Sequence, residues 1–152
     1  MNAGIEPLLS ELAARLGVNE LNLDDNNICR LVFDERLVVD LEPSTDGKLV
    51  HLTGVAGAVP ADATAHFFRK LLVANFLGQQ TGEAALAVDE FNNEVVLGQR
   101  IALDVLDVNS FVNRLEEFVN RLESWMDALA KDAVASEVET SSPPGANGGI
   151  RV

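Results

Sequence analysis

The sequence predicts an α+β domain in which three helices accompany an antiparallel, five-stranded twisted sheet, in the order α-β-β-β-α-β-β-α. Three observations carry this prediction. Three stretches have the length and apolar content of helices, and short segments of extended character are bounded by turn residues. The short links between successive strands favour antiparallel pairing. The chain has 152 residues, enough for one domain with its own core.

The first helix is expected over residues 7–16. Pro7 is suited to a first helical turn, where its missing N–H is not needed. Leu8, Leu12 and Leu16 follow at helical spacing and make one apolar stripe. Gly17 is a natural end for this helix.

Three strands should follow, over residues 28–33, 36–42 and 48–55. Residues rich in turn chemistry, 43–47, separate the second strand from the third. The second strand has the period of a half-buried strand, because every other residue is a large apolar one: Leu37, Val39 and Leu41. These three strands are predicted to form an antiparallel meander.

A second helix is expected over residues 61–77, ending at Gly78. Its apolar residues cover more of the circumference than one buried face requires. Two explanations remain open: both sides pack within the chain, or a second chain covers one of them. Two further strands should follow over residues 84–88 and 94–103, joined by a turn at 89–93.

The last helix has the clearest pattern. Asp107 or Ser110 can cap its start. The hexapeptide Phe-Val-Asn-Arg-Leu-Glu occurs at 111–116 and again at 118–123. The resulting apolar seam is too short for an independent coiled coil, so it is expected to pack across the sheet. The seam consists of Phe111, Leu115, Phe118, Leu122, Trp125 and Leu129.

The composition changes beyond residue 135, where Ser, Glu, Pro and Gly replace the apolar residues. Such a segment has little to bury and contains several helix breakers. Residues 1–135 are therefore expected to form the folded domain, and residues 136–152 a disordered tail.

Acidic residues dominate the charge, with 24 Asp and Glu against 11 Lys and Arg and a formal net charge of −13 at pH 7. Such a surface repels nucleic-acid phosphates and anionic lipid. Its acidity either selects partners with basic segments or serves solubility alone. No stretch is long enough for a membrane span, and the N-terminus lacks the features of a signal peptide. We therefore expect no nucleic-acid partner, no membrane insertion and a cytoplasmic location.

Few residues could carry chemistry. Cys29, the only cysteine, lies in an apolar run that predicts a buried thiol. His51 and His66 have no second ligand at metal-binding spacing. The acidic stretch at 24–27 lacks the later ligands of a calcium loop, and the glycine pair at 54–57 lacks the rest of a phosphate-binding motif. The sequence therefore predicts no catalytic site, no metal, no cofactor and a protein that is not an enzyme.

Several short motifs resemble a known family. One is a helix end of leucines followed by Asn75 and an apolar residue, and another is a glycine followed by a small-apolar strand that ends in Asp89. The pattern continues through apolar groups at 95–97 and 101–103, then Leu106, Asp107 and Phe111. In this order and spacing, over about residues 5–130, the motifs resemble the class I type III secretion chaperones, the Tir chaperone (CesT-like) family.

The resemblance implies a bacterial, cytoplasmic homodimer without enzymatic activity. Each dimer of that family binds the N-terminal chaperone-binding segment of one or more secreted effectors and keeps it extended, soluble and secretion-competent. Addition of a strand to a sheet edge and docking into an apolar groove are the two physical modes of such binding. The secretion ATPase is a candidate further partner.

The resemblance also suggests site residues. The second helix and the strand after it form much of the family's dimer interface, which implies Phe67, Phe68, Leu71, Ala74, Leu86 and Val88 here. The effector-binding surface should involve the first helix and the strands, through Leu8, Leu12, Leu16, Leu37, Val39 and Leu41, although core packing explains each of these equally well. An adaptor or assembly factor of the same fold outside secretion remains an alternative, as does a small-ligand-binding α+β domain.

Overall fold

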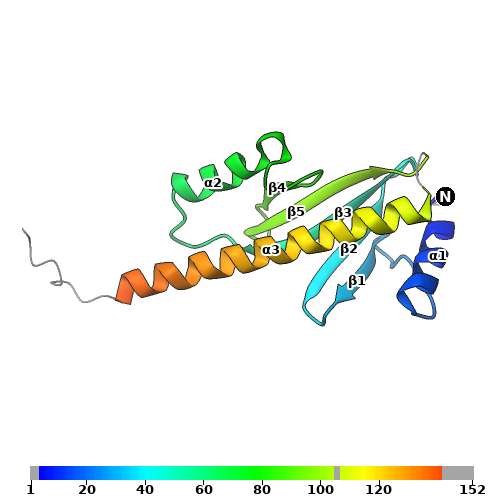
Figure 1. Cartoon of the computed structure of the whole chain (residues 1–152), viewed down its shortest axis with the longest axis horizontal. Helices are drawn as coiled ribbons and strands as arrows, with labels where there is room; N and C mark the ends of the chain where they lie inside the picture. Colours follow the sequence, from blue (N-terminus) through cyan, green and yellow to red (C-terminus); the bar gives the residue numbers. More distant parts are fainter. Residues whose placement is uncertain (1–3, 105–106, 142–152) are drawn as a thin grey trace, which may run out of the picture.

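The computed structural model describes residues 4–104 and 107–141, with side chains placed through residue 135. Its elements follow the predicted order (Figure 1). They are α1 (Glu6–Leu16), β1 (Cys29–Phe33), β2 (Leu37–Pro43), β3 (Leu49–Ala58), α2 (Ala65–Asn75), the short 3₁₀ helix η1 (Phe76–Gly78), β4 (Ala85–Asp89), β5 (Glu94–Ala102) and α3 (Val108–Ser141). The predicted α+β class and its five-stranded antiparallel sheet are confirmed.

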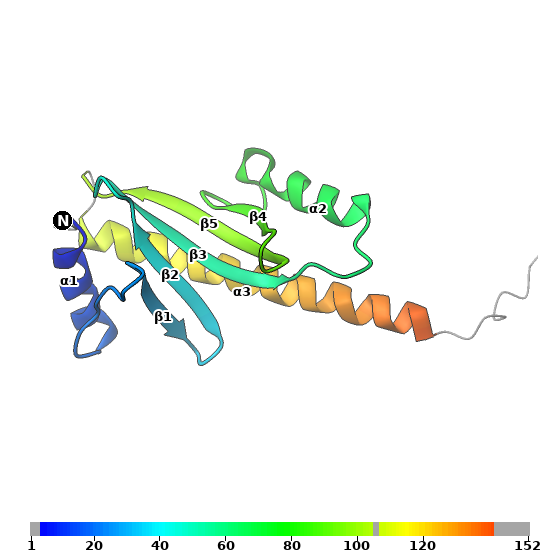
Figure 2. The ribbon, with the colours of Figure 1, turned by 180° about the vertical axis from the view of Figure 1, so that it is seen from behind.

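The sheet has the strand order β1-β2-β3-β5-β4, so β5 lies between β3 and β4. The central pair, β3 with β5, is the longest and contains a bulge between Val55 and Gly57. In Figures 1 and 2, α3 runs across one face of the sheet, α1 lies at the end near the start of α3, and α2 lies beside β4. None of the described helices covers the other face, which Figure 2 presents. The sheet edges are therefore β1 and β4.

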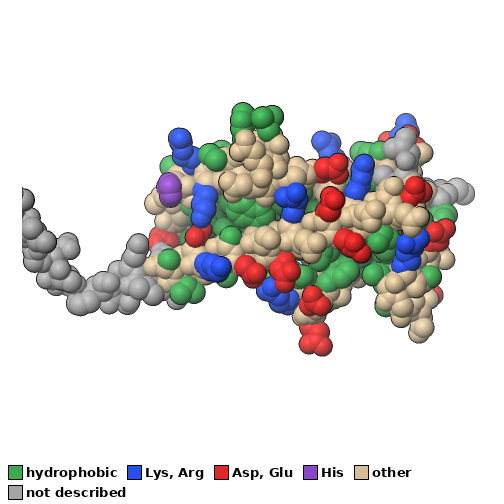
Figure 3. Space-filling model, in the orientation of Figure 1, with side chains coloured by type: hydrophobic (Ala, Val, Ile, Leu, Met, Phe, Trp, Pro, Cys, Tyr) green, Lys and Arg blue, Asp and Glu red, His purple; other side chains and the backbone are tan. Residues whose placement is uncertain are grey.

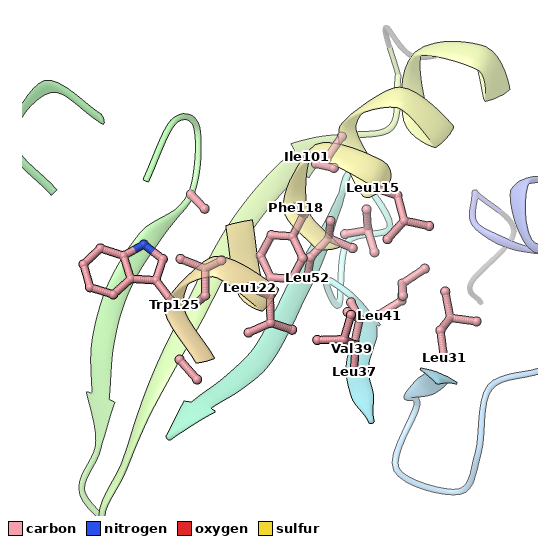
Figure 4. Packing of buried hydrophobic residues seen from close by; sticks show 14 of the residues in the cluster. Leu31, Leu37, Val39, Leu41, Leu52, Ile101, Leu115, Phe118, Leu122 and Trp125 are labelled. Atoms are coloured by element: carbon pink, nitrogen blue, oxygen red, sulfur yellow. The ribbon is translucent and has the colours of Figure 1, made fainter. Parts of the chain in front are cut away.

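The core lies between α3 and the sheet. All six apolar residues of the predicted α3 seam are buried, which confirms that the seam packs across the sheet. They meet the inward-facing residues of the strands, among them Leu41 and Leu52, as Figure 4 shows. Alternate residues of β2, Leu37, Val39 and Leu41, are buried, as the period-two pattern predicts.

Two glycines of β3 let α3 approach the sheet. A methyl group at Gly54 would lie 2.5 Å from Cδ2 of Leu122 and 3.2 Å from the carbonyl oxygen of Val38. At Gly57 the same group would lie 3.4 Å from Cδ1 of Leu129. This glycine pair therefore serves helix-to-sheet packing and lies within a strand, not in a phosphate-binding loop.

Both ends of α1 and the start of α3 follow the sequence signals. Pro7 lies in the first turn of α1, and Gly17 ends the helix with φ 72°, a left-handed conformation that glycine adopts without strain. The Oδ1 atom of Asp107 accepts a hydrogen bond from the backbone N–H of Ser110, 2.8 Å away, so Asp107 is the cap of α3.

Several boundaries differ from the expected ones by one or two residues, and three differ by more. Helix α2 begins at Ala65 and not at residue 61, because the N–H of Ala63 bonds Pro60 in a turn and Thr64 is extended. Strand β3 continues to Ala58. Helix α3 continues past the expected boundary at residue 135 to Ser141, since the first helix breaker after it is Pro143. The rest of the predicted tail, 142–152, lies outside the described residues.

Substitution of Gly54 by alanine should destabilise the fold. The added methyl group would overlap the fully buried side chain of Leu122 and lie 3.2 Å from the carbonyl oxygen of Val38, and overpacking of this kind costs about 1–3 kcal/mol. The urea midpoint, followed by Trp125 emission, should fall. Gly98→Ala is the matched control, because its new methyl group would lie 3.8 Å from the nearest atom. Equal midpoints for the two variants would show that α3 does not need the close approach.

Asp107→Ala should lower stability at neutral pH and have little effect in acid. The hydrogen bond from the backbone of Ser110 is the main reason that the pKa of Asp107 lies below its ordinary value. A carboxylate with a lowered folded-state pKa stabilises the protein above its unfolded-state pKa, and this contribution is lost as pH falls through the folded-state pKa. Unfolding midpoints from pH 7 to pH 2 should therefore converge for wild type and variant. A difference that persists at pH 2 would contradict the charge-dependent cap, and Asp62→Ala is the control for losing an exposed aspartate.

Candidate partner-binding surfaces

The groups considered for metal binding in the sequence do not gather in the described part of the structure. No cluster of three or more potential metal ligands occurs in residues 4–104 and 107–135. Cys29 is buried in β1, and its pKa is raised by burial and, to a smaller extent, by the charges of Asp40 and Asp24. Asp24 itself closes a turn by accepting the N–H groups of Asn26 and Ile28, as the turn prediction requires. Among the described helices, none is long and apolar enough to cross a bilayer.

An apolar groove lies where α1, the end of β1 and the first half of α3 meet. Its floor contains the buried side chains of Leu12 and Leu115, and its walls include Leu16, which is 41% exposed. Polar side chains stand at its rim. The complete lining is Leu12, Arg15, Leu16, Phe33, Val112, Leu115, Glu116, Val119 and Asn120. The groove can therefore accept an apolar side chain and offer both charges at its border.

Strand β1 borders this groove and forms one edge of the sheet. It pairs only with β2, from Cys29↔Leu41 to Phe33↔Leu37. Val32 is 57% exposed. The one charged residue of the strand, Arg30, pairs with Asp40 of β2 at 2.8 Å. An edge strand in this state can accept an added strand, and Phe33 connects that edge to the groove.

The second apolar surface covers the outer side of α2 and η1. We call it the α2 face, and it consists of Phe68, Leu72, Val73, Phe76 and Leu77. Leu72 is 69% exposed and Leu77 is 83% exposed. Hydrophobic side chains project at the top of Figure 3, over the η1 end of α2. So many large apolar side chains in one exposed patch are typical of an interaction surface.

Several contacts hold α2 and the following loop against α3. Lys70 pairs with Asp132, and the indole N–H of Trp125 donates to the carbonyl oxygen of Gln80 at 3.0 Å. The guanidinium of Arg121 lies against Gly82, where a methyl group would come within 2.5 Å of its Nε atom. These contacts hold the α2 face in a defined position relative to α3.

Comparison with known proteins places the chain. The model of the Tir chaperone protein (CesT) family matches residues 7–126. The chain belongs to this family. The Tir chaperone of Citrobacter freundii is 26% identical over 116 residues, which are 76% of this chain and 73% of the relative. The family resemblance predicted from the sequence is thus confirmed.

Solved structures share the fold of this CesT-family chain. A chain in the crystal structure of the ExsC–ExsE complex has a TM-score of 0.72 at 24% identity, over 84% of this chain and 94% of that chain. A chain in the structure of the HopA1–SchA chaperone–effector complex has a TM-score of 0.70 at 18% identity, over 83% of this chain and 95% of that chain.

The structure divides the predicted dimer residues of this CesT-family chain into two groups. Leu71, Ala74 and Leu86 are buried within the chain, where α2 packs on β4. Phe67 is half-buried, whereas Phe68 and Val88 are exposed. Leu72, Val73, Phe76 and Leu77 are exposed and were not among the predicted dimer residues, because their exposure depends on which side of α2 lies against the sheet.

The predicted effector-binding residues also separate. Leu8 and Leu12 of α1 and the β2 residues Leu37, Val39 and Leu41 are buried in the core, and Leu16 is exposed. Of the six, the groove brings together Leu12 and Leu16. The prediction omitted the groove residues Phe33, Val112 and Val119. The last two occupy the same position in the repeated hexapeptide, so the repeat was the signal that could have found them.

Proposed function

We propose that this chain is a type III secretion chaperone that works as a homodimer. It binds the N-terminal chaperone-binding segment of one or more secreted effectors and keeps that segment extended, soluble and secretion-competent. The observation that carries the proposal is the apolar groove beside an open strand edge, in a chain whose family is that of the Tir chaperones. A relative named Tir chaperone and a fold shared with a chaperone–effector complex support it.

The groove and the edge of β1 supply complementary kinds of recognition. A strand that adds to β1 gains backbone hydrogen bonds without reading its own side chains closely. The groove then selects the register, because only apolar side chains gain by entering it. The net charge of −13 favours segments that carry basic residues. Holding a segment in this way needs no chemical step, so the protein is proposed to be a non-enzymatic one that works in the bacterial cytoplasm.

The α2 face supports the homodimer. Its exposed apolar residues lie near the β4 edge of the sheet, whereas the groove lies near the β1 edge. A second copy can therefore cover the α2 face without blocking the groove. Leu71, Ala74 and Leu86 hold α2 against β4 from the inside, and Phe68 and Val88 extend the exposed surface. Burying such a surface in a dimer removes it from water.

Leu16→Glu should weaken effector binding without unfolding the protein. The Leu16 side chain is partly exposed at the groove wall. Replacing an apolar side chain in a binding site with a charged one raises the dissociation constant about tenfold or more. Effectors would first be co-purified from the native host, and the protease-protected segment would then be titrated by calorimetry. Val18→Glu is the control, because Val18 is similarly exposed but lies outside the groove. Equal affinities for the two variants would refute the groove as the binding site.

Leu72→Glu should convert the dimer to monomer. The buried charge would lose its hydration in the interface, whereas in the monomer this position is open to solvent. Light scattering coupled to gel filtration should report half the wild-type mass, with an unchanged circular dichroism spectrum. Val38→Glu, on the uncovered face of the sheet, should remain dimeric. A dimeric Leu72→Glu protein would overturn the assignment of the α2 face.

A further inference from the structure

The β4 edge of the sheet differs from the β1 edge. Strand β4 carries no proline, its one charge is at the last residue, Asp89, and Val88 is exposed. Uncharged apolar edge strands readily pair with strands of other molecules, and proteins usually blunt them with charges, prolines, bulges or a covering element. Asp89 leaves the middle of the strand apolar, and there a neighbouring element supplies the protection.

The side chain of Asn75 provides this protection. Its Nδ2 atom donates to the carbonyl oxygen of Leu86 at 2.9 Å, and its Oδ1 atom accepts from the N–H of Leu86 at 2.8 Å. A residue on a neighbouring antiparallel strand would make the same two-bond pair. A carboxamide suits this role because it presents a donor and an acceptor side by side, which neither a carboxylate nor an apolar side chain can do.

The local backbone fixes Asn75 in this position. Asn75 is the last residue of α2, and the chain then reverses through Leu77 and Gly78, which have φ values of 53° and 66°. Leu77 in a left-handed conformation costs energy that the surrounding structure must offset. The buried side chains of Leu71 and Ala74 hold the helix on β4. The amide is therefore pre-set at the strand edge and does not depend on a partner.

We propose that the side-chain amide of Asn75 takes the place of a sixth strand at the β4 edge. It occupies the hydrogen-bonding positions of Leu86 and prevents β4 from pairing with an extended segment, above all with β4 of a second copy. The choice of a second copy rests on the proposed homodimer, because the α2 face belongs to the helix that contacts β4. The closure of the edge itself rests only on the bonds to Leu86. Added strands are thereby confined to β1.

The test removes the side-chain amide of Asn75 and measures hydrogen exchange and self-association at the β4 edge. Asn75→Ala should raise amide hydrogen exchange in the segment 84–89 about tenfold or more, since two hydrogen bonds to Leu86 are lost. Exchange in β3, residues 49–58, should stay unchanged. The variant should also form species larger than the wild-type assembly as its concentration rises, measured by light scattering. Gln79→Ala, an exposed polar residue of the same loop, is the control and should match wild type in both measurements.

Two outcomes would overturn the proposal. Unchanged exchange at 84–89 would show that the amide does not protect the edge, and faster exchange without larger species would show that it has a purely structural role. If Asn75→Ala does not fold, Asn75→Ser replaces it, because a hydroxyl is too short to bond both groups of Leu86. Effector binding is not part of this readout, so a failure of the chaperone assignment would leave the exchange result intact, and the reverse also holds.

Discussion

The packing of α3 across the sheet is the interaction on which the rest of the structure depends. One apolar seam, from Phe111 to Leu129, covers the inner face of the strands, and Gly54 allows Leu122 to reach the backbone of β3. Because α3 occupies the inner face, the apolar side chains of the groove and of the α2 face lie at its two flanks. The groove beside α1 lies at one flank and the α2 face at the other. The position of both candidate binding surfaces is thus a consequence of where one helix lies.

The same residue types build the core and the surfaces, and local geometry decides which role each takes. Leu71 and Leu72 are adjacent in sequence, yet the first is buried on β4 and the second is largely exposed. Val112 and Val119 lie one heptad apart on α3 and line the groove, while Phe111 and Phe118 beside them are fully buried. The net charge of −13 opposes the self-association that such apolar surface favours.

Local signals predicted most of the fold. Pro7 and Gly17 lie at the start and the end of α1, and Asp107 caps α3. These roles were predictable because a turn or a cap depends on a few neighbouring residues. The α3 seam was predictable because its period is regular over five helical turns. The buried side of α2 was not, since its apolar residues surround the helix and only tertiary contacts choose among them. The role of Asn75 depends on a contact with Leu86 that no local pattern encodes. The groove likewise joins Leu16, Phe33 and Val119 from three separate elements, so it could not be predicted from local patterns.

The strand order has a consequence for the way this protein is made. Strand β3 pairs with β5, and the intervening residues 59–93 form α2, η1 and β4. The meander of β1, β2 and β3 can close locally, but the central pair requires closure of this long loop, which is entropically costly and slow. During synthesis β3 leaves the ribosome well before β5, so in a nascent chain one edge of this apolar central strand is still unpaired. A protein that holds extended segments of other proteins therefore passes through a stage in which one of its own strands is incompletely paired.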